Sequence, residues 1–376
     1  MSMLYFHIPF CKQKCSYCNF HFSTSLKMKE EMLVAMKKEL KLRKDELMNK
    51  RLPSLYFGGG TPSILSVDEI QSLIEEASRY FDFQQDIEIT LEANPDDLDK
   101  NFLKELSKTA VNRLSIGIQS FHEADLKLMN RAHNAQEAES CVKRSQDMGL
   151  ENISVDLIYG SPVSDFEIWK ANLQKTIDLD IPHISSYALT IEPKTALNNW
   201  VQTQKITAPK EQEQSQDFYY MVNFLKANGF QHYEISNFAR QGFHSRHNSA
   251  YWQYQAYLGI GPSAHSYNGS TERSWNLANN SLYIKQLAEN KLPKETEILT
   301  EQDRYNEMIM IGLRTIWGVD LAKLEQDFSE TILHHFRREI EPKLHRQLLI
   351  IEDNHLKIPE KHWFMADGIA SDLFMV

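Results

Sequence analysis

The stretch Cys11-Lys-Gln-Lys-Cys15-Ser-Tyr-Cys18 directly follows a short apolar run, Leu4–Ile8, near the beginning of the chain. The chain has four cysteines, and three of them fall within this stretch. A disulfide framework would instead spread an even number of cysteines along a short secreted chain. Because this chain is long and gathers its thiols at one point, the pattern favours metal binding.

Three closely spaced thiolates in a loop after a strand can ligate three of the four irons of a [4Fe–4S] cluster. Zinc is the alternative, but structural zinc usually takes four protein ligands. His7, His21 and Cys141 are the candidates for a fourth ligand, and none stands at a convincing spacing. We therefore expect the three cysteines to hold a [4Fe–4S] cluster whose remaining iron is open to a small molecule.

Short apolar or β-branched runs recur through the first half of the chain and are separated by stretches with helical periodicity. This alternation predicts βαβ units and a parallel sheet. Six such units form either an open doubly wound sheet or an incomplete barrel, and periodicity does not choose between them. In both architectures the ligand lies at the carboxyl ends of the strands. The runs are Leu4–Ile8, Ser54–Phe57, Ile87–Leu91, Arg113–Ile118, Ile153–Ile158 and Ile184–Ile191.

The predicted helices follow from apolar stripes and capping signals. Ser66 and Glu69 have the spacing of a capping box, which predicts a helix that begins there and runs through Tyr80. The other predicted helices span residues 28–40, Asp99–Ala110, His122–Met148, Asp165–Asp178 and Gln202–Lys226.

Three regions are expected along the chain. Residues 1–235 form the α/β core, and residues 236–295, rich in aromatics and histidines, complete it. Residues 296–376 form a small C-terminal α+β domain that resembles a winged helix. The domain is more acidic than basic, which favours a protein-docking or lid role over DNA binding. Its predicted elements are helices over Thr300–Trp317 and Leu321–Leu344, the second ended or kinked by Pro342, and a hairpin of Leu348–Glu352 and His355–Ile358 around Asp353-Asn354.

Composition excludes several classes of protein. The chain has 376 residues, of which 42% are hydrophobic and 24% charged, and its net charge is −10. So acidic a chain lacks the footprint of a nucleic-acid binder. No apolar run approaches the roughly 18 residues of a membrane span, and the N-terminus has no secretory signal pattern. We expect a cytoplasmic protein.

The segment Tyr5-Phe-His7-Ile-Pro-Phe-Cys11-x3-Cys15-x-Tyr17-Cys18 resembles the opening of the radical S-adenosylmethionine (SAM) superfamily. It is most similar to the branch that contains oxygen-independent coproporphyrinogen III oxidase. The resemblance implies that SAM chelates the open iron and that one electron cleaves it to methionine and a 5′-deoxyadenosyl radical. The fold it implies is an incomplete (β/α)6 barrel, in agreement with the six units.

Further motifs follow in the expected order. Gly58-Gly59-Gly60-Thr61-Pro62 comes after the second strand, and glycines let backbone amides approach a ligand closely. Polar residues end the next strands, and the resemblance implies that they contact SAM, with Arg131 paired to its carboxylate. The expected SAM-contacting residues are Tyr5, Gly59, Gly60, Thr61, Glu92, Gln119, Arg131 and Asp156.

Two departures from the oxidase pattern bear on function. The oxidase carries a fourth cysteine two residues after the third, where this chain has Phe20, and this chain begins only ten residues before Cys11. Both features resemble the HemW-type haem chaperones, which share the barrel without the decarboxylation. The segment His247-Asn248-x-x-Tyr251-Trp252 matches the motif associated with haem binding there, because histidine suits haem iron and aromatic rings pack against the macrocycle. The alternative is that His247 is a hydrogen-bonded core histidine.

The resemblance implies a protein that binds a [4Fe–4S] cluster, SAM and one haem and delivers the haem to acceptors such as membrane respiratory enzymes. It also implies an electron donor, and a homodimer is an open option. Two enzymes are the alternatives, a radical coproporphyrinogen III decarboxylase and a SAM enzyme, such as a methyltransferase, with a different large substrate. No residue is assigned a catalytic role, and whether SAM is cleaved stays open. Cys141 is expected to be a structural cysteine in a helix.

Overall fold

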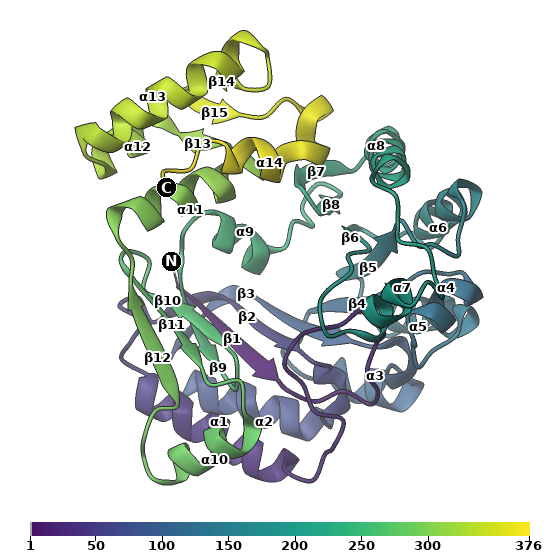
Figure 1. Ribbon diagram of the computed structural model, residues 1–376. Coiled ribbons are helices and arrows are strands. Elements are labelled where there is room, and N and C mark those ends of the chain that lie inside the picture. The colour runs from purple at the N-terminus through teal and green to yellow at the C-terminus, as the bar shows by residue number, and fades with distance from the viewer. Residues whose placement is uncertain (1) are drawn as a thin grey trace. The chain divides into compact units, whose positions relative to one another are not determined.

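The computed structural model describes residues 2–376, which divide into two compact units (Figure 1). The first unit runs to Asp217 and also contains Ser245–Glu297, and the second contains Phe218–His244 and Ile298–Val376. Residues 218–244, expected to lie in the core and the aromatic segment, belong to the second unit. The reason is backbone pairing, since the amide of Ile235 donates to the carbonyl of Arg314 and that of Ile316 to the carbonyl of Tyr233.

The predicted strands form a parallel sheet in which chain order is also spatial order. A doubly wound sheet reverses its strand order near the middle. The consecutive order found here therefore favours the incomplete barrel over the doubly wound sheet. Of the polar residues expected to contact SAM, Glu92 and Gln119 stand at the carboxyl ends of the third and fourth strands. Asp156, also expected at a strand end, lies in the middle of the fifth strand, and Arg131 lies outside the strands. The strands are β1 (Ser2–Ile8), β2 (Arg51–Gly59), β3 (Asp82–Ala93), β4 (Arg113–Gln119), β5 (Ile153–Tyr159) and β6 (His183–Ala188).

A strand that was not predicted occupies the free edge of β1. Residues Ala256–Ile260 form β9, which pairs in parallel with β1 on the side opposite β2. Because β9 takes this edge, β1 and β6 are not neighbours and the sheet stays open, as the incomplete barrel requires. The sheet continues beyond β9 through β10 (His265–Tyr267), β11 (Glu272–Asn276) and β12 (Lys294–Ile298).

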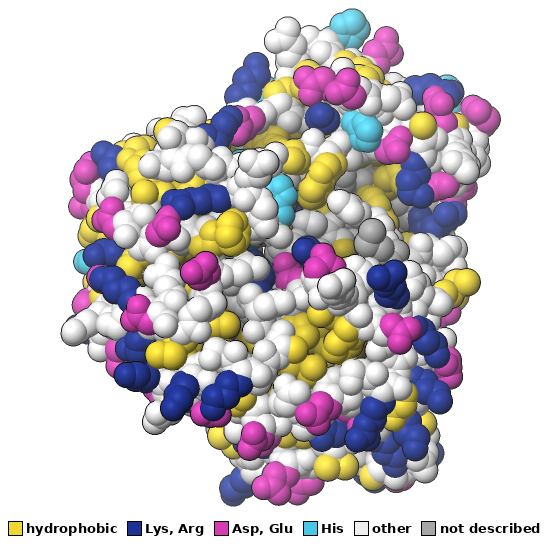
Figure 2. Space-filling view, turned by 180° about the vertical axis from the view of Figure 1, so that it is seen from behind, with side chains coloured by type: hydrophobic (Ala, Val, Ile, Leu, Met, Phe, Trp, Pro, Cys, Tyr) yellow, Lys and Arg dark blue, Asp and Glu magenta, His cyan; other side chains and the backbone are white. Residues whose placement is uncertain are grey.

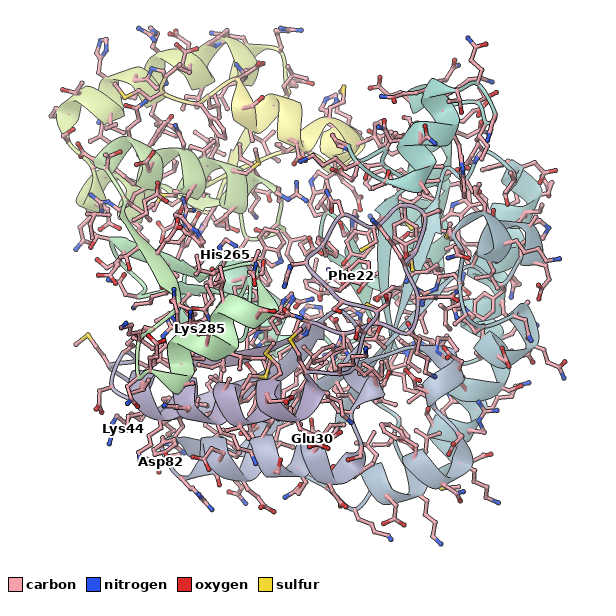
Figure 3. All side chains as sticks on the ribbon, turned by 60° about the horizontal axis from the view of Figure 1, so that its bottom comes forward. Phe22, Glu30, Lys44, Asp82, His265 and Lys285 are labelled. Carbon is pink, nitrogen blue, oxygen red and sulfur yellow. The ribbon has the colours of Figure 1, made fainter. Side chains whose placement is uncertain are left out.

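Helices connect the strands, and their beginnings follow local capping. Ser66 and Glu69 form the predicted capping box, and Asp165 caps the helix predicted after it. Figure 3 shows Glu30 and Lys44 at the two ends of α1, which packs against α2 and α10. The helices of the first unit are α1 (Lys29–Arg43), α2 (Val67–Ser78), α3 (Lys100–Leu106), α4 (Glu123–Leu128), α5 (Ala135–Asp147), α6 (Phe166–Asp178), α7 (Ala196–Gln202), α8 (Glu211–Ala227, which continues into the second unit), α9 (Arg246–Trp252) and α10 (Asn280–Ala288), with 3-10 turns at Pro62–Ile64 and Pro95–Asp97.

In this part of the chain, two of the helix predictions are wrong in extent. The segment predicted as one helix over His122–Met148 is two helices, because Asn130 takes a left-handed backbone conformation with φ of 52° and Asn134 caps a new helix. The helix predicted over Gln202–Lys226 begins only at Glu211, as α8, because residues 203–210 after the end of α7 are not helical.

The second unit contains the predicted hairpin. Glu352 pairs with His355, and both turn residues between them have positive φ, 49° at Asp353 and 62° at Asn354, as a type I′ turn requires. The long helix predicted here is broken into α12 and α13, and Pro342 lies inside the last turn of α13. The elements are β7 (Gln231–Glu234), β8 (Asn237–Ala239), α11 (Glu301–Leu313), β13 (Val319–Asp320), α12 (Leu321–Asp327), α13 (Glu330–His345), β14 (Ile350–Glu352), β15 (His355–Lys357), a 3-10 turn at Glu360–Met365 and α14 (Ala366–Ser371).

The surface carries mixed charge. Figure 2 shows Lys and Arg side chains interspersed with Asp and Glu side chains over the face in view. Within residues 2–376, no helix combines the length and the apolar character that crossing a membrane would require.

Candidate functional site

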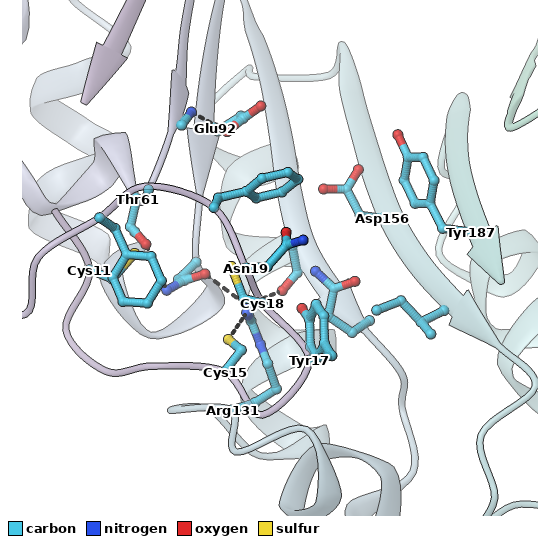
Figure 4. A pocket seen from close by; sticks show the side chains of 18 of the residues that line it. Cys11, Cys15, Tyr17, Cys18, Asn19, Thr61, Glu92, Arg131, Asp156 and Tyr187 are labelled. Carbon is cyan, nitrogen blue, oxygen red and sulfur yellow. Dashed lines mark hydrogen bonds between the residues drawn. The ribbon is translucent and has the colours of Figure 1, made fainter. Parts of the chain in front are cut away.

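A cavity of about 650 Å³ lies at the carboxyl ends of the parallel strands (Figure 4). All three clustered cysteines line it, together with residues from the ends of β2 to β6. Every residue of the expected SAM set except Tyr5 also lines it. The cavity therefore unites the cysteine loop with residues that lie between positions 59 and 156 of the chain. Its lining from the two groups is Cys11, Cys15, Cys18, Gly59, Gly60, Thr61, Glu92, Gln119, Arg131 and Asp156.

Two hydrogen bonds of Ser16 fix the position of the cysteine loop. The amide of Ser16 donates to the carbonyl of Met129, and its hydroxyl donates to the carbonyl of Leu128 at 2.7 Å. Burial raises the pKa of Cys11 to about 11 and also raises the pKa of Cys18, so without a metal these thiols are neutral. Within residues 2–376, no three His, Cys, Asp or Glu side chains converge closely enough to hold a single metal ion.

Arg131 lies beside the cysteine loop and faces its sulfurs (Figure 4). One terminal nitrogen, Nη1, is 3.2 Å from Sγ of Cys15. The other, Nη2, donates to Oδ1 of Asn94 at 2.7 Å and to the carbonyl of Gly117 at 2.6 Å. Its Nε is buried without a hydrogen-bond partner, and within residues 2–376 the guanidinium has no ion pair with a carboxylate. The side chain thus keeps an unused donor, and its charge acts on Asp96 and Asp156 without a direct ion pair.

Two carboxylates face the cavity. Burial, followed by the charge of Asp156, raises the pKa of Glu92 to about 8. Burial also raises the pKa of Asp156 to about 6, although the charge of Arg113 opposes the shift. Oε1 of Glu92 accepts a hydrogen bond from the Tyr56 hydroxyl at 2.8 Å, and Oε2 accepts one from the Gly59 amide at 3.2 Å. A cationic ligand would favour the ionised form of both carboxylates.

The backbone amides of the glycine loop bind other parts of the chain. The amide of Gly60 donates to a carbonyl of β1, and the amide of Thr61 donates to the carbonyl of Phe10 at 2.7 Å. The Gly59 amide donates to a carboxylate, so all three amides have partners in this structure. Gly59, Gly60 and Thr61 line the cavity, and contact of this loop with a ligand stays a prediction. A Cβ at Gly59 would lie 2.7 Å from the His7 ring, and one at Gly60 would lie 2.5 Å from the Phe10 carbonyl. The glycines are needed because β1 and its loop pack against them.

Gln119 has a strained backbone at the end of β4. Its φ is 70°, a left-handed value that side-chain-bearing residues rarely adopt and that costs of order 1–3 kcal/mol. The strain turns the buried side chain toward the cavity, where its Nε2 lies beside Gly117 and close to Arg131. Such strain gathers at functional sites.

The expected haem motif forms α9, and none of its residues lines the cavity. His247 is 1% exposed. Its Nδ1 lies 2.9 Å from the Ser54 hydroxyl and its Nε2 lies 3.0 Å from the Tyr251 hydroxyl. Its ring stacks on Tyr56, with 4.9 Å between the ring centroids. Burial, followed by the charge of Arg113, lowers the pKa of His247 to about 3. In this structure His247 is a neutral histidine with both ring nitrogens paired.

The remaining site predictions are placed nearby. Tyr5 stacks on Tyr56 with 6.0 Å between centroids and lies behind the cavity wall, while Asn248 and Trp252 are half-buried on α9. Several residues that line the cavity were not predicted, Asn94, Ser115 and Tyr187 among them. Tyr56, which binds Glu92 from outside the lining, was not predicted either. Tyr56 lies on the same strand face as Gly58, so the alternation along β2 could have found it, whereas Asn94 carried no signal of its own.

Comparison with known proteins gives concordant results. Residues 5–172 match the radical SAM superfamily, and residues 299–365 match the HemN C-terminal domain. A protein named heme chaperone HemW from Lactococcus lactis is 32% identical over 97% of this chain and 95% of its own length. Another with that name, from Bacillus subtilis, is 32% identical over 88% of each chain. The structure of coproporphyrinogen III oxidase (HemN) from Escherichia coli, a radical SAM enzyme, superimposes with a TM-score of 0.84 at 22% identity and covers 100% of this chain and 90% of that one.

Proposed function

This chain belongs to the HemW family of the radical SAM superfamily, and we propose that it is a haem chaperone, which binds one haem and passes it to acceptor proteins. Similarity to the HemW proteins extends over nearly the whole chain at 32% identity. The likeness to the oxidase, at 22% identity, concerns the fold alone. At the position where the oxidase is expected to carry a fourth cysteine stands Phe20, whose side chain is exposed.

We propose that Cys11, Cys15 and Cys18 hold a [4Fe–4S] cluster. Three thiols on one cavity wall suit a cluster, because each thiolate binds a different iron and the three need not converge on one point. The raised pKa values of Cys11 and Cys18 do not oppose this, since a bound metal draws the proton from a coordinating thiol. When bound, the cluster supplies one open iron and a one-electron reductant.

One observation carries the ligand side of the proposal. The same cavity is lined by a guanidinium with an unused donor and by two carboxylates whose pKa values are raised. A ligand that bears both a carboxylate and cationic groups fits this donor set, and SAM is such a ligand. We assign Arg131, through its unpaired Nε, to the carboxylate of SAM. Glu92 and Asp156 would face its positive charges, while Gln119 and Thr61 supply further polar contacts.

The proposed haem contacts are His247, Asn248, Tyr251 and Trp252. A neutral imidazole is the form that ligates haem iron, and the lowered pKa of His247 keeps it neutral at every physiological pH. To reach iron, the ring has to give up one of its two hydrogen bonds. Haem binding by this motif therefore requires either that the Tyr251 hydroxyl leaves Nε2 or that His247 moves away from Ser54 on β2.

The acceptors we propose are haem proteins, membrane respiratory enzymes among them, reached from the cytoplasm. Cluster reduction would require an electron-donating partner, and a homodimer is compatible with the proposal.

A transfer assay tests the proposed function. Protein loaded with cluster and haem is incubated with an apo-haemoprotein such as apomyoglobin, and the transferred haem is followed by its absorption after the two proteins are separated. If the protein is a chaperone, it delivers haem to the apo-haemoprotein faster than an equal concentration of hemin bound to albumin does. In a parallel anaerobic incubation with SAM and reductant, coproporphyrinogen III should stay unchanged. Conversion to protoporphyrinogen without haem delivery would contradict the proposal and favour the decarboxylase.

A further inference from the structure

Tyr56 lies between the cavity and α9 and touches one residue of each. Its hydroxyl donates to Oε1 of Glu92 at 2.8 Å, and Glu92 lines the cavity. Its ring stacks on the imidazole of His247 at 4.9 Å and an interplanar angle of 30°. Tyr56 is 8% exposed and does not line the cavity itself. One buried side chain thus joins the expected SAM contact to the expected haem ligand.

His247 is held in this position from three sides. Ser54, on the same strand as Tyr56, binds its Nδ1, and Tyr251 binds its Nε2. Its backbone amide donates to Oε1 of Glu88 at 3.1 Å. A ring in this state has no lone pair to offer to iron. To become a ligand, the imidazole needs a second arrangement that frees one ring nitrogen, and the arrangement that releases Ser54 also takes the ring off the Tyr56 stack.

A cation in the cavity stabilises the arrangement seen here, in which His247 stacks on Tyr56, and it does so through Glu92. Without a cation beside it, the buried carboxyl of Glu92 favours its neutral form. A positively charged ligand favours the carboxylate, and a hydrogen bond from a hydroxyl to a carboxylate is roughly twice as strong as one between neutral groups. The hydroxyl of Tyr56 is then held more firmly, and with it the ring on which His247 stacks.

We infer that Tyr56 is a positioning residue that couples the two sites, so that bound SAM holds His247 against β2 and weakens haem binding. The inference rests on the proposed function and adds its regulation, since SAM favours release of the haem. Because coupling between two ligands is reciprocal, haem must weaken SAM binding by the same factor.

Anaerobic hemin titrations of cluster-loaded protein, with and without saturating SAM, test this. In the wild type we expect SAM to raise the Kd for hemin at least about fivefold, the lower end of the usual range of coupling. Tyr56→Phe keeps the ring and removes only the hydroxyl, so both ligands still bind and the ratio of the two Kd values falls to about one. A ratio near one in the wild type, a tighter Kd with SAM, or an unchanged ratio in Tyr56→Phe would each overturn the inference.

Tyr283→Phe is the matched control. The hydroxyl of Tyr283 also donates to a buried carboxylate, Glu39, but neither residue lines the cavity or belongs to α9. This variant should keep the wild-type ratio. Ser54→Ala is a second variant, which frees Nδ1 of His247 and should tighten hemin binding with and without SAM. If Ser54→Ala left both hemin Kd values unchanged, the hydrogen bond from Ser54 to His247 would not limit hemin binding, and the inference would fail.

A measurement without haem covers the case in which Tyr56→Phe does not fold. In wild-type protein with ¹⁵N-labelled histidine, addition of SAM should shift the ring nitrogen signals of His247, identified by their absence in His247→Gln. No shift would overturn the inference. Absence of any saturable hemin binding to the wild type would instead contradict the proposed function itself.

Discussion

Nη1 of Arg131 lies 3.2 Å from Sγ of Cys15. The two residues are 116 positions apart, and the contact links the residue proposed to bind the carboxylate of SAM to a proposed ligand of the cluster. A positive group beside a cluster sulfur stabilises the reduced, more negative state of the cluster.

We therefore predict that Arg131→Met lowers the midpoint potential of the cluster and weakens SAM binding about tenfold or more, the loss expected when a charged hydrogen bond is removed. An EPR-monitored redox titration and a SAM-binding titration measure the two effects. Arg79→Met, which removes an exposed arginine paired with Glu76, is the control and should change neither. An unchanged potential would show that the contact with Cys15 does not tune the cluster.

Cys15→Ser should abolish assembly of the cluster, because the two remaining thiolates cannot complete a three-cysteine site. The iron and sulfide content and the visible absorption after anaerobic reconstitution measure this. Cys141→Ser is the matched control, since that buried thiol donates to the carbonyl of Ala138 within α5 and lines no part of the cavity. Equal iron content in the wild type and Cys15→Ser would refute the ligand assignment.

SAM binding should depend on pH through Glu92. Its pKa is raised from 4.5 to about 8, so the empty site binds a proton over this range, and a cationic ligand must displace it. Affinity for SAM should therefore rise as the pH approaches 8 and then level off. Calorimetric titrations at several pH values should show a shallower rise for Glu92→Gln than for the wild type. Identical profiles would exclude Glu92 as the titrating group.

The same shift affects stability. A carboxyl whose folded pKa is raised holds more protons in the folded state than in the unfolded state. Its contribution to stability is therefore present below pH 4.5 and is lost as the pH rises through about 8. Urea denaturation of the cofactor-free protein should show this loss, and Glu92→Gln should remove it.

Gly59→Ala should destabilise the fold more than Gly149→Ala. Both glycines have positive φ, 105° and 80°, so each substitution imposes a backbone cost of about 1–2 kcal/mol. At Gly59 the new methyl group would also lie 2.7 Å from the His7 ring, whereas nothing lies within 4 Å of one at Gly149. The difference between the two unfolding free energies measures the clash. Equal losses would mean that β1 yields to the methyl group.

Local features of the fold could be predicted from the sequence, and long-range contacts could not. The strands and the capping box of Ser66 and Glu69 depend on neighbours within a few residues, so they leave a readable pattern. The division of the helix predicted over His122–Met148 was also readable, because Asn134 and Glu137 have capping-box spacing that was overlooked.

The site is a harder case. The cysteine motif and the strand-end polar residues are recognisable as sets, and the cavity brings them together. The contacts of His247 with Ser54 and Tyr56 join segments about 190 residues apart and depend on how α9 packs against β2. No local pattern encodes such packing, so the restraint on the proposed haem ligand emerged only from the structure.

The most direct test of the central claim is an anaerobic hemin titration of the cluster-loaded wild type beside His247→Ala and the control His265→Ala, which changes an exposed histidine of the same aromatic-rich segment. The Soret band should saturate near one haem per chain in the wild type and the control, with clearly weaker binding in His247→Ala. Unchanged binding in His247→Ala would move the haem site elsewhere on the chain. Absence of saturable binding in the wild type would contradict the proposal that this protein carries haem.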